Sequence, residues 1–548
     1  MIKLTINNEI KEVEKGTTLL SLLDEQEQKK YFTCLVNGRV RELNFKISFD
    51  ATLQFLDLSY IESMKAYEAS MRFIVAKAFY ELYPEEHIIF SYNVSRSIFV
   101  KSIDEHFIID YSVVKKINEY IKKLIDEDLP IERLTFTKDE ALKIFNDFHF
   151  EDKIELLKYK PEATVHLYKC GGYFNYMHSY MVPSTGFLKK YIIKQYAPGL
   201  IIQYPRAEKN GEIPAFEETR VYGKTLKMAS KWVKMINAEK VCKINSHTTK
   251  DQANEFIQIC ETKHNNMLAE LGEMIQNDIE NIRLIAIAGP SSSGKTTFSN
   301  RLKIELMSRG ITPVAISMDN YYLDRDKIKP GPDGKLDLED INTLDIDLFN
   351  EQMLAIISGE RVQMPKFDFT IAKRVPGEFI QVPKNSPIII EGIHALNELM
   401  SESIPAHQKF KIFISPQMQV NIDDHSPLST TDLRLIRRIV RDKQFRNATA
   451  EHTLGMWESV RSGEFKWIYP HQESSNYVYN SELTYELCVL KKYALPLLQD
   501  IKTDSPFFVT ANRLIKYLKY FQEIDESAIP CNSLIREFIG GSCFNVNE

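Results

Sequence analysis

The chain has 548 residues, 44% of them hydrophobic and 26% charged, and its 69 Lys and Arg against 75 Asp and Glu give a net charge of −6. At roughly 150 residues per domain, this length predicts about three to four domains, and the composition excludes a disordered or fibrous chain. The slight acidity excludes a general attraction to nucleic acid, so any such contact would need a local basic patch.

Cysteine spacing and hydropathy indicate the compartment. The seven cysteines are scattered, odd in number and never spaced as a C-x-x-C pair, which argues against a disulfide framework. The N-terminus lacks a signal pattern, and no stretch approaches about eighteen uninterrupted apolar residues, so we expect a cytoplasmic protein without membrane contact. His166, Cys170 and His178 could be zinc ligands by type, but no second ligand cluster accompanies them and structural roles are favoured.

Residues 1–62 predict a small β-grasp domain. Strands are expected at 2–6 and 9–13, with a helical segment at 18–23 after Gly16. Through TINNEIKEVEKGTTLLSLL and CLVNGRVRELNFKI, the segment resembles the TGS domain of threonyl-tRNA synthetases and some GTPases.

Residues 63–225 resemble the second additional, editing-like domain of threonyl-tRNA synthetases, an α+β unit, through ASMRFIVAKAFYELYP and HSYMVPSTGFLKKY. That family carries two histidines one helical turn apart, and Ala69 and Phe73 stand at those positions here. We therefore expect no aminoacyl-tRNA editing. Residues 226–280 predict a helical connector, with a coiled-coil interaction helix as the alternative.

The segment that predicts chemistry is RLIAIAGPSSSGKTT, residues 283–297. It places G-x-x-x-x-G-K-[ST] between an apolar strand at 284–288 and a helix that continues to Gly310, the context that this nucleotide-binding motif requires. Backbone amides of such a turn hold the phosphates of ATP, Lys295 supplies a catalytic charge and Thr296 offers a hydroxyl to Mg²⁺. The predicted ATP-binding residues are Gly289, Pro290, Ser291, Ser292, Ser293, Gly294, Lys295, Thr296 and Thr297.

Two carboxylates follow apolar strands. Asp319 comes after a strand at 313–317 and is the candidate base that accepts a proton from a substrate hydroxyl, although an Asp capping a turn is the alternative. Glu391 ends a strand at 387–390 and is a candidate Mg²⁺ ligand, with a structural role as its alternative.

Arginines on one predicted helix favour phosphate binding. Arg434, Arg437, Arg438 and Arg441 fall within about 100° of one helical arc, with no acid inside that arc. The phosphoryl group in transfer would match these positive charges. The alternative is a basic helix face exposed to solvent. Arg446 lies just beyond this set on the same helix.

GPSSSGKTT, SMDNYY, MPKFDF, EGIHAL, KIFISP and RLIRRIVRDKQFR occur in the order of the uridine kinase branch of the phosphoribulokinase/uridine kinase family. Residues 281–500 resemble that family, which implies an α/β P-loop fold with a parallel sheet, ATP and Mg²⁺ as cofactors, and Asp319 as base. The whole chain resembles bacterial multidomain uridine kinase-like proteins. The resemblance further implies lid arginines Arg437, Arg438, Arg441 and Arg446 and substrate residues Tyr321, Tyr322 and Arg374.

The departures from the family fall where the substrate is bound. Phe367 stands for a tyrosine and Ala372 for a histidine that contact the base, so pyrimidine selectivity is in doubt. In 338–347 the family's ribose-holding stretch is replaced, and among Glu339, Asp340 and Asp345 we select Asp340. Residues 501–548 predict a helix at 512–524 and a tail without assigned chemistry.

These patterns together predict an ATP-dependent kinase that phosphorylates the 5′-hydroxyl of a ribonucleoside. A sugar phosphate or another small alcohol is the alternative acceptor. An RNA-associated regulatory NTPase, with RNA or tRNA contact through the N-terminal domains, is the alternative of another class. We also expect a homo-oligomer.

Overall fold

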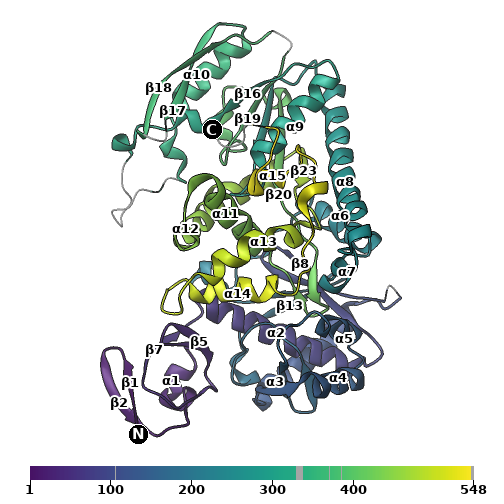
Figure 1. Cartoon of the computed structure of the whole chain (residues 1–548), viewed down its shortest axis with the longest axis vertical. Helices are drawn as coiled ribbons and strands as arrows, with labels where there is room; N and C mark the ends of the chain where they lie inside the picture. The colour runs from purple at the N-terminus through teal and green to yellow at the C-terminus, as the bar shows by residue number, and fades with distance from the viewer. Residues whose placement is uncertain (105, 329–336, 338, 369–370, 384–385, 545–548) are drawn as a thin grey trace.

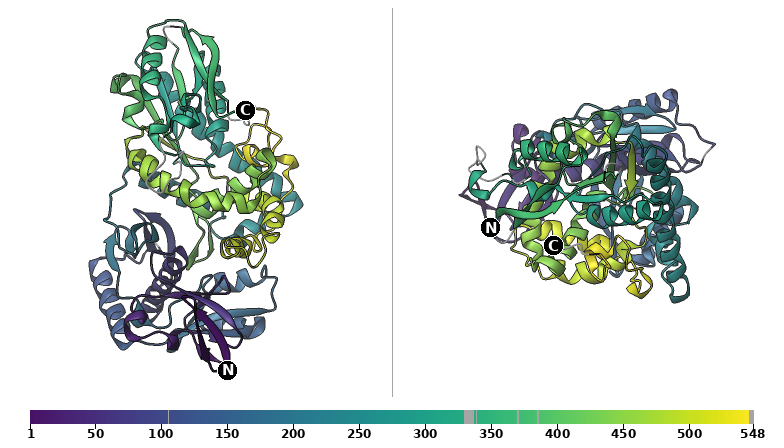
Figure 2. Two further views of the ribbon diagram at one scale, coloured as in Figure 1. Left: turned by 90° about the vertical axis from the view of Figure 1, so that its left-hand side faces the viewer. Right: turned by 90° about the horizontal axis from the view of Figure 1, so that it is seen from above.

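The N-terminal segment and the P-loop segment lie toward opposite ends of an elongated molecule (Figure 1). The computed structural model describes residues 1–104, 106–328, 337, 339–368, 371–383 and 386–544. Figure 2 shows that the C-terminal helices lie between the two ends. No helix within these ranges is both long and apolar enough to cross a bilayer.

The N-terminal segment forms a mixed five-stranded sheet in the order β2-β1-β7-β4-β5. Ile2 and Leu4 alternate along β1 and point into a small core, as a half-buried strand requires. The helical segment predicted at 18–23 is observed in part, as a 3-10 helix at Leu20–Leu22. It is shorter than expected because residues 17–18 pair with residues 46–47, and Asp24 then caps α1. The elements are β1 (Ile2–Ile6), β2 (Glu9–Val13), β3 (Thr17–Thr18), α1 (Glu25–Gln28), β4 (Thr33–Val36), β5 (Arg39–Glu42), β6 (Lys46–Ile47) and β7 (Ala51–Leu56).

The following segment packs helices against two antiparallel sheets, in the orders β13-β14-β9-β8 and β10-β11-β12. Its central helix α2 (Ile61–Leu82) is buried along most of its length, and Ala69 and Phe73 have no exposed surface. The other elements are β8 (Ile88–Val94), β9 (Ser97–Ser102), α3 (Tyr111–Glu127), β10 (Glu132–Thr137), α4 (Lys138–Asp147), α5 (Glu151–Leu157), β11 (Thr164–Cys170), β12 (Tyr173–Asn175), β13 (Ile192–Tyr196) and β14 (Gly199–Gln203).

Two of the three candidate zinc ligands of this segment have a polar partner within the protein. The Thr135 hydroxyl lies 2.9 Å from His166 Nδ1, and His178 Nε2 lies 3.1 Å from Asp423 Oδ2. Cys170 is buried. Each histidine thus contacts a side chain of the protein, and Cys170 lies in the hydrophobic core.

The connector contains α6 (Val221–Met235), α7 (Val241–Ser246) and the long helix α8 (Lys250–Asn277). The apolar side of α8, including Phe256, Ile257 and Leu271, is buried within the chain, and α8 packs against α9 (Lys295–Ser308). The helical prediction is confirmed, and the apolar stripe that suggested a coiled coil is covered by the protein itself.

The C-terminal half is an α/β unit around a five-stranded parallel sheet in the order β16-β19-β15-β20-β23. Its strands are apolar on both faces: Leu284 and Ala286 pack into one core and Ile285 and Ile287 into another, as expected for a buried parallel sheet. The three strands predicted from the sequence are confirmed within one residue at each end. The strands are β15 (Leu284–Ala288), β16 (Val314–Ser317), β19 (Ile388–Glu391), β20 (Lys409–Ser415) and β23 (Tyr477–Asn480).

Helices and two hairpins surround this sheet. The helix predicted at 512–524 is observed as α14, which begins and ends earlier. The remaining elements are α10 (Ile346–Ile357), β17 (Val362–Asp368), β18 (Lys373–Ile380), β21 (Asn421–Asp423), β22 (Ser426–Pro427), α11 (Thr430–Arg446), α12 (Ala450–Gly463), α13 (Glu486–Gln499), α14 (Phe508–Leu518) and α15 (Arg536–Ile539).

A buried charge network joins the two halves of the chain. Lys153 of α5 has no exposed surface, and its Nζ lies 3.4 Å from Asp152 Oδ2 and 3.7 Å from Asp423 Oδ1 at the end of β21. The Asp424 amide donates to Asp152 Oδ2 at 2.7 Å. Burial alone would raise the pKa of Asp423, but Lys153 and His178 outweigh it and hold that pKa below its usual range. The hairpin β21–β22 is therefore an electrostatic anchor for the front half.

Replacing Lys153 with Met tests this anchor. The change removes the buried ammonium that Asp152 and Asp423 share, and breaking such a pair costs about 3–5 kcal/mol. We expect the first urea-unfolding transition of Lys153→Met to shift to clearly lower urea, whereas Lys158→Met, on an exposed lysine of the same segment, leaves the midpoint in place. Equal midpoints for the two variants would contradict this account.

Candidate active site

The turn between β15 and α9 has the backbone that the G-x-x-x-x-G-K-[ST] motif requires. A Cβ at Gly289 would collide with the Ile414 carbonyl of β20, so only glycine fits between the strands. Gly294 caps α9 with φ +89°, a conformation that other residues rarely adopt. Glycine is therefore required at both positions for local steric reasons.

Several hydrogen-bond donors of this turn are placed where they could bind an oxygen-rich ligand. The buried hydroxyls of Ser292, Ser293 and Thr297 have no hydrogen-bond partner among the described residues. Lys295 Nζ folds back onto the carbonyl oxygens of Gly289 at 3.0 Å and Pro290 at 3.4 Å. Together with the backbone amides at the start of α9, these donors fit a polyphosphate.

The two predicted carboxylates face this turn from neighbouring strands. Asp319 follows β16 in a short 3-10 turn, Met318–Tyr321, where its amide donates to Ser317 Oγ at 3.3 Å. Its side chain stays accessible, but crowding by protein atoms raises its pKa, and the charges of Lys295 and Arg446 oppose that rise. Asp319, Lys295 and Arg446 therefore share one electrostatic environment.

Glu391 ends β19 close to the start of α9. Thr296 Oγ1 lies 3.4 Å from Glu391 Oε1. Burial raises the pKa of Glu391 to about 7, Lys295 opposes the rise, and Asp319 and Glu537 add to it. Mg²⁺ is commonly held by one or two protein oxygens together with phosphate oxygens. The Thr296 hydroxyl and the Glu391 carboxylate fit that donor set.

Two arginines of α11 hold the turn from behind. Arg434 Nε donates to the Ser291 carbonyl at 3.0 Å, and Arg437 Nη1 donates to the Ser292 carbonyl at 3.3 Å. Both guanidinium groups are buried and paired with acids: Arg434 with Glu464 of the segment after α12, and Arg437 with Glu486 of α13.

The expectation that no acid neutralises the arginine face is therefore wrong. The acids come from other elements, Glu464 and Glu486, and from Asp442 of α11 itself. Arg437, predicted as a lid residue, is a fully buried support of the phosphate-binding turn.

The other lid candidates surround a single acid. Arg438, Arg441 and Arg446 all pair with Asp442, at 3.3, 2.8 and 3.5 Å, and Arg438 also donates to Ser291 Oγ at 2.9 Å. The Arg446 side chain is 60% exposed. Three guanidinium groups against one carboxylate leave a positive surplus beside the turn.

The two predicted substrate tyrosines differ in their surroundings. Tyr321 has no exposed surface, its hydroxyl donates to Gln352 at 2.8 Å, and its ring packs edge-on against Phe349. It is thus a core residue, contrary to the prediction. Tyr322 is half-buried, and its ring centroid lies 5.7 Å from that of Phe367. Its pKa is raised well above the usual value, mainly by burial and also by the charges of Asp319 and Glu339.

The carboxylates of the 338–347 segment are not equivalent. Asp340 caps a turn and pairs with Lys466 at 2.7 Å. Glu339, which sequence reasoning passed over, lies near Arg438 and Lys295, and burial raises its pKa to about 7 against the pull of Arg438. Leu338, Phe369 and Thr370 of the two departing segments lie outside the described residues.

The predicted substrate residue Arg374 already has an acidic partner. Its Nη1 lies 2.8 Å from Asp345 Oδ2, and its amide donates to Asp324 at 2.9 Å. The pair is partly exposed, and Arg374 lies in β18 close to the turn of the β17–β18 hairpin. If Arg374 contacts the acceptor substrate, its guanidinium would bind that substrate and Asp345 at the same time.

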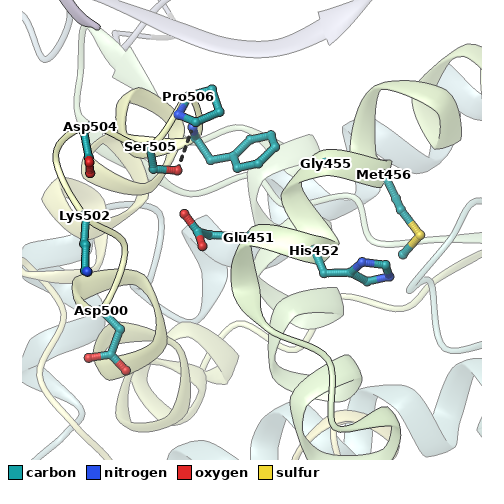
Figure 3. A pocket seen from close by; sticks show the side chains of 10 residues that line it. Glu451, His452, Gly455, Met456, Asp500, Lys502, Asp504, Ser505 and Pro506 are labelled. Atoms are coloured by element: carbon teal, nitrogen blue, oxygen red, sulfur yellow. Dashed lines mark hydrogen bonds between the residues drawn. The ribbon is translucent and has the colours of Figure 1, made fainter. Parts of the chain in front are cut away.

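A separate hollow of about 670 Å³ lies between α12 and the loop before α14 (Figure 3). Glu451, His452, Asp500 and Asp504 are among its lining residues, and no residue of the phosphate-binding turn is. This hollow is therefore separate from the site described above.

Part of the C-terminal half matches a known family. Residues 284–484 match the model of the Phosphoribulokinase / Uridine kinase family. A uridine kinase of Ureaplasma parvum serovar 3 is 28% identical over 194 residues, which cover 35% of this chain and 85% of that kinase. The C-terminal half thus carries a P-loop kinase domain of the phosphoribulokinase/uridine kinase family.

The N-terminal region matches a different protein. A threonine–tRNA ligase of Clostridium kluyveri is 31% identical over 192 residues, which cover 34% of this chain and 30% of the ligase. The match thus spans less than a third of that ligase. A solved structure of a possible uridine kinase from Bacillus stearothermophilus is 19% identical and covers 27% of this chain and 79% of its own, with a TM-score of 0.23. At that TM-score the likeness assigns neither fold nor function.

The buried arginine support can be tested by stability. Arg437→Met removes the cation beside Glu486 and leaves that carboxylate buried and unpaired, which costs about 3–5 kcal/mol. We expect a lower thermal midpoint for the kinase domain, followed by circular dichroism. Arg446→Met is the control because that side chain is largely exposed. A wild-type midpoint for Arg437→Met would show that the pair is dispensable.

Proposed function

We propose that the protein is an ATP-dependent kinase that transfers the γ-phosphoryl group to the 5′-hydroxyl of a ribonucleoside. The observation that carries this proposal is the meeting of Lys295, Asp319 and Glu391 at the carboxyl ends of adjacent parallel strands and the start of α9. In open α/β sheets, ligands bind at this edge.

Transfer requires a base, a held phosphate and an oriented hydroxyl. The acceptor oxygen attacks the γ-phosphorus in line, the bond from that phosphorus to the β-γ bridging oxygen breaks, and ADP leaves. Asp319 is the group that orients the hydroxyl and accepts its proton. Its carboxylate is accessible and lies near Lys295, the residue of the phosphate-binding turn that carries a positive charge. Lys295 and the amides at the start of α9 stabilise the charge on the transferring group.

Thr296 and Glu391 are the residues that would hold Mg²⁺, which supplies charge neutralisation on the β- and γ-phosphates when bound. The surplus positive charge of Arg438, Arg441 and Arg446 around Asp442 supports a role for this end of α11 in contacting phosphate. Arg446 is the most suitable because it is exposed and its charge reaches Asp319.

The acceptor side favours a nucleoside over a simple alcohol. Tyr322 and Phe367 form an aromatic pair next to Asp319, which suits a flat base. Among the acids of this region, we assign the sugar hydroxyls to Glu339 rather than Asp340, because Glu339 lies near Lys295 whereas Asp340 is paired with Lys466. The matched uridine kinase also supports a nucleoside acceptor.

Substitution of the proposed base gives the direct test. General-base catalysis contributes about 10²–10⁴-fold, so Asp319→Asn should lower nucleoside-dependent ADP production at least about 100-fold while leaving the circular dichroism spectrum unchanged. Asp326→Asn, an exposed acid downstream on the same segment, is the control and should retain activity.

The acceptor class is tested by measuring ADP release with nucleosides, sugar phosphates and tRNA in parallel. A nucleoside response that depends on Asp319 supports the proposal. Release with sugar phosphates alone would transfer the assignment to that acceptor class. ATPase activity stimulated by tRNA and not by nucleosides would favour a regulatory NTPase.

A further inference from the structure

A cationic cavity lies where the N-terminal sheet, the second segment and α14 meet. Its volume is about 450 Å³, within the range of about 300–1,000 Å³ typical of small-molecule sites. Eight Lys and Arg residues line it against two glutamates, and no residue of the phosphate-binding turn contributes. In a chain with a net charge of −6, this is a marked local concentration of positive charge.

Three of these cations meet around one tyrosine. The Arg133 guanidinium and the Lys516 ammonium lie 5.6 and 5.8 Å from the centre of the Tyr180 ring, and Arg41 donates to the Tyr180 hydroxyl at 3.3 Å. Across the ranges that the structure describes, none of these three cations forms an ion pair with a carboxylate. Glu42 acts on Arg133 and Arg41, and Glu162 acts on Lys516, only at longer range, so the repulsion among the three cations is compensated in part.

The electrostatics agree with this geometry. Burial lowers the pKa of Lys516, and the neighbouring charges of Arg133 and Arg41 lower it further. One of the two glutamates, Glu162, is already used by Lys160 at 2.7 Å. Lys65 and Arg513 pair with Asp432, and Lys519 shares Glu162, so the lining cations without an ion pair among the described residues are Arg39, Arg41, Arg133 and Lys516.

We propose that this cavity binds a small organic ligand that carries two or more phosphate groups, of the nucleoside polyphosphate class. Several unpaired cations match several phosphate oxygens, because charge-assisted hydrogen bonds from Arg to phosphate are the strong ones. The aromatic rings beside them suit a flat base. Three segments enclose the cavity, which favours a small molecule over an RNA strand. The site is separate from the phosphate-binding turn, so it goes beyond the proposed kinase activity.

Calorimetric titration of the full chain with inorganic tripolyphosphate tests the cavity. We expect two classes of site, one of which weakens at least about tenfold in Arg133→Ser/Lys516→Ser. Lys11→Ser/Lys29→Ser, which removes two exposed lysines of the N-terminal segment, is the charge-matched control and should retain both classes. The other class should weaken in Lys295→Ala.

A single class of site that disappears in Lys295→Ala would overturn the cavity proposal. So would binding of an RNA hairpin that requires Arg133 and Lys516 when tripolyphosphate does not bind there. Because the titration contains no acceptor, these outcomes are independent of whether the protein phosphorylates nucleosides.

A different observation concerns the C-terminal segment, which contacts the phosphate-binding turn itself. Leu534, Ile535 and Phe538 have no exposed surface. Leu534 packs so closely on Gly294 that a Cβ there would collide with it, and the Phe538 ring centre lies 5.0 Å from the Arg437 guanidinium. The segment is therefore docked by apolar contacts.

This docking places a carboxylate at the start of α9. The Thr297 amide donates to Glu537 Oε2 at 3.0 Å, and both groups are buried. Thr297 is the third residue of α9, and amides at this end of a P-loop helix are the donors that hold phosphates. The Glu537 carboxylate thus has the partner that a phosphate oxygen would take.

We infer that Glu537 is a built-in competitor of nucleotide phosphate at the start of α9. This inference rests on the proposed function and concerns regulation of the same site. The carboxylate leaves the Thr297 amide when a phosphate binds, while Leu534, Ile535 and Phe538 keep the segment in place. The apparent affinity for nucleotide is then reduced by the fraction of molecules in which Glu537 occupies the amide.

Nucleotide affinity measured without an acceptor tests this competition. We expect the Kd of ADP to fall about tenfold in Glu537→Ala, because the competing anion is lost. Glu523→Ala, an exposed acid earlier in the C-terminal segment, is the control and should bind like wild type. In the wild-type chain, ADP should leave hydrogen exchange of the amides in residues 533–540 unchanged, because the apolar contacts keep the segment docked.

Weaker ADP binding by Glu537→Ala, or protection of residues 533–540 by ADP, would show that the segment completes the nucleotide site and would overturn the inference. An unchanged Kd would overturn it as well. Absence of ADP binding to the wild-type chain would instead refute the proposed kinase function.

Discussion

The phosphate-binding turn keeps its shape because two buried guanidinium groups hold its carbonyl oxygens. A turn whose amides face a ligand directs its carbonyls the other way, and these need donors in a place that water does not reach. Arg434 and Arg437 supply the donors, and Glu464 and Glu486 pair with the guanidinium groups and fix their orientation. The loop is therefore ordered before any nucleotide binds. The conformational entropy of the loop is lost during folding, so nucleotide binding does not have to order it.

The sequence predicts the features that depend on neighbours along the chain. The apolar strands, the turn with its two glycines and the helix that begins at Lys295 follow from local patterns, and the structure has them where expected. Asp319 and Glu391 could be selected because each follows a buried strand, and strand ends meet at one edge of a parallel sheet.

What the sequence does not predict depends on partners distant along the chain. The acids that pair with Arg434 and Arg437 lie 30 and 49 residues away, so a helical arc could not identify them. Adjacent tyrosines look alike in sequence, yet Tyr321 points into the core and Tyr322 toward Asp319, because a 3-10 turn directs consecutive side chains differently. The choice of Asp340 over Glu339 failed to anticipate the Lys466 pair for the same reason.

The hairpin β21–β22 ties the kinase domain to the synthetase-like front through Asp423, Asp424 and Lys153. A kinase domain that lost the front half would expose carboxylates whose partner cation belongs to the missing part. Neither half alone would retain a surface on which every charge of this network has its partner. Separate production of either half would therefore leave a charge that is buried in the whole chain without its counter-ion.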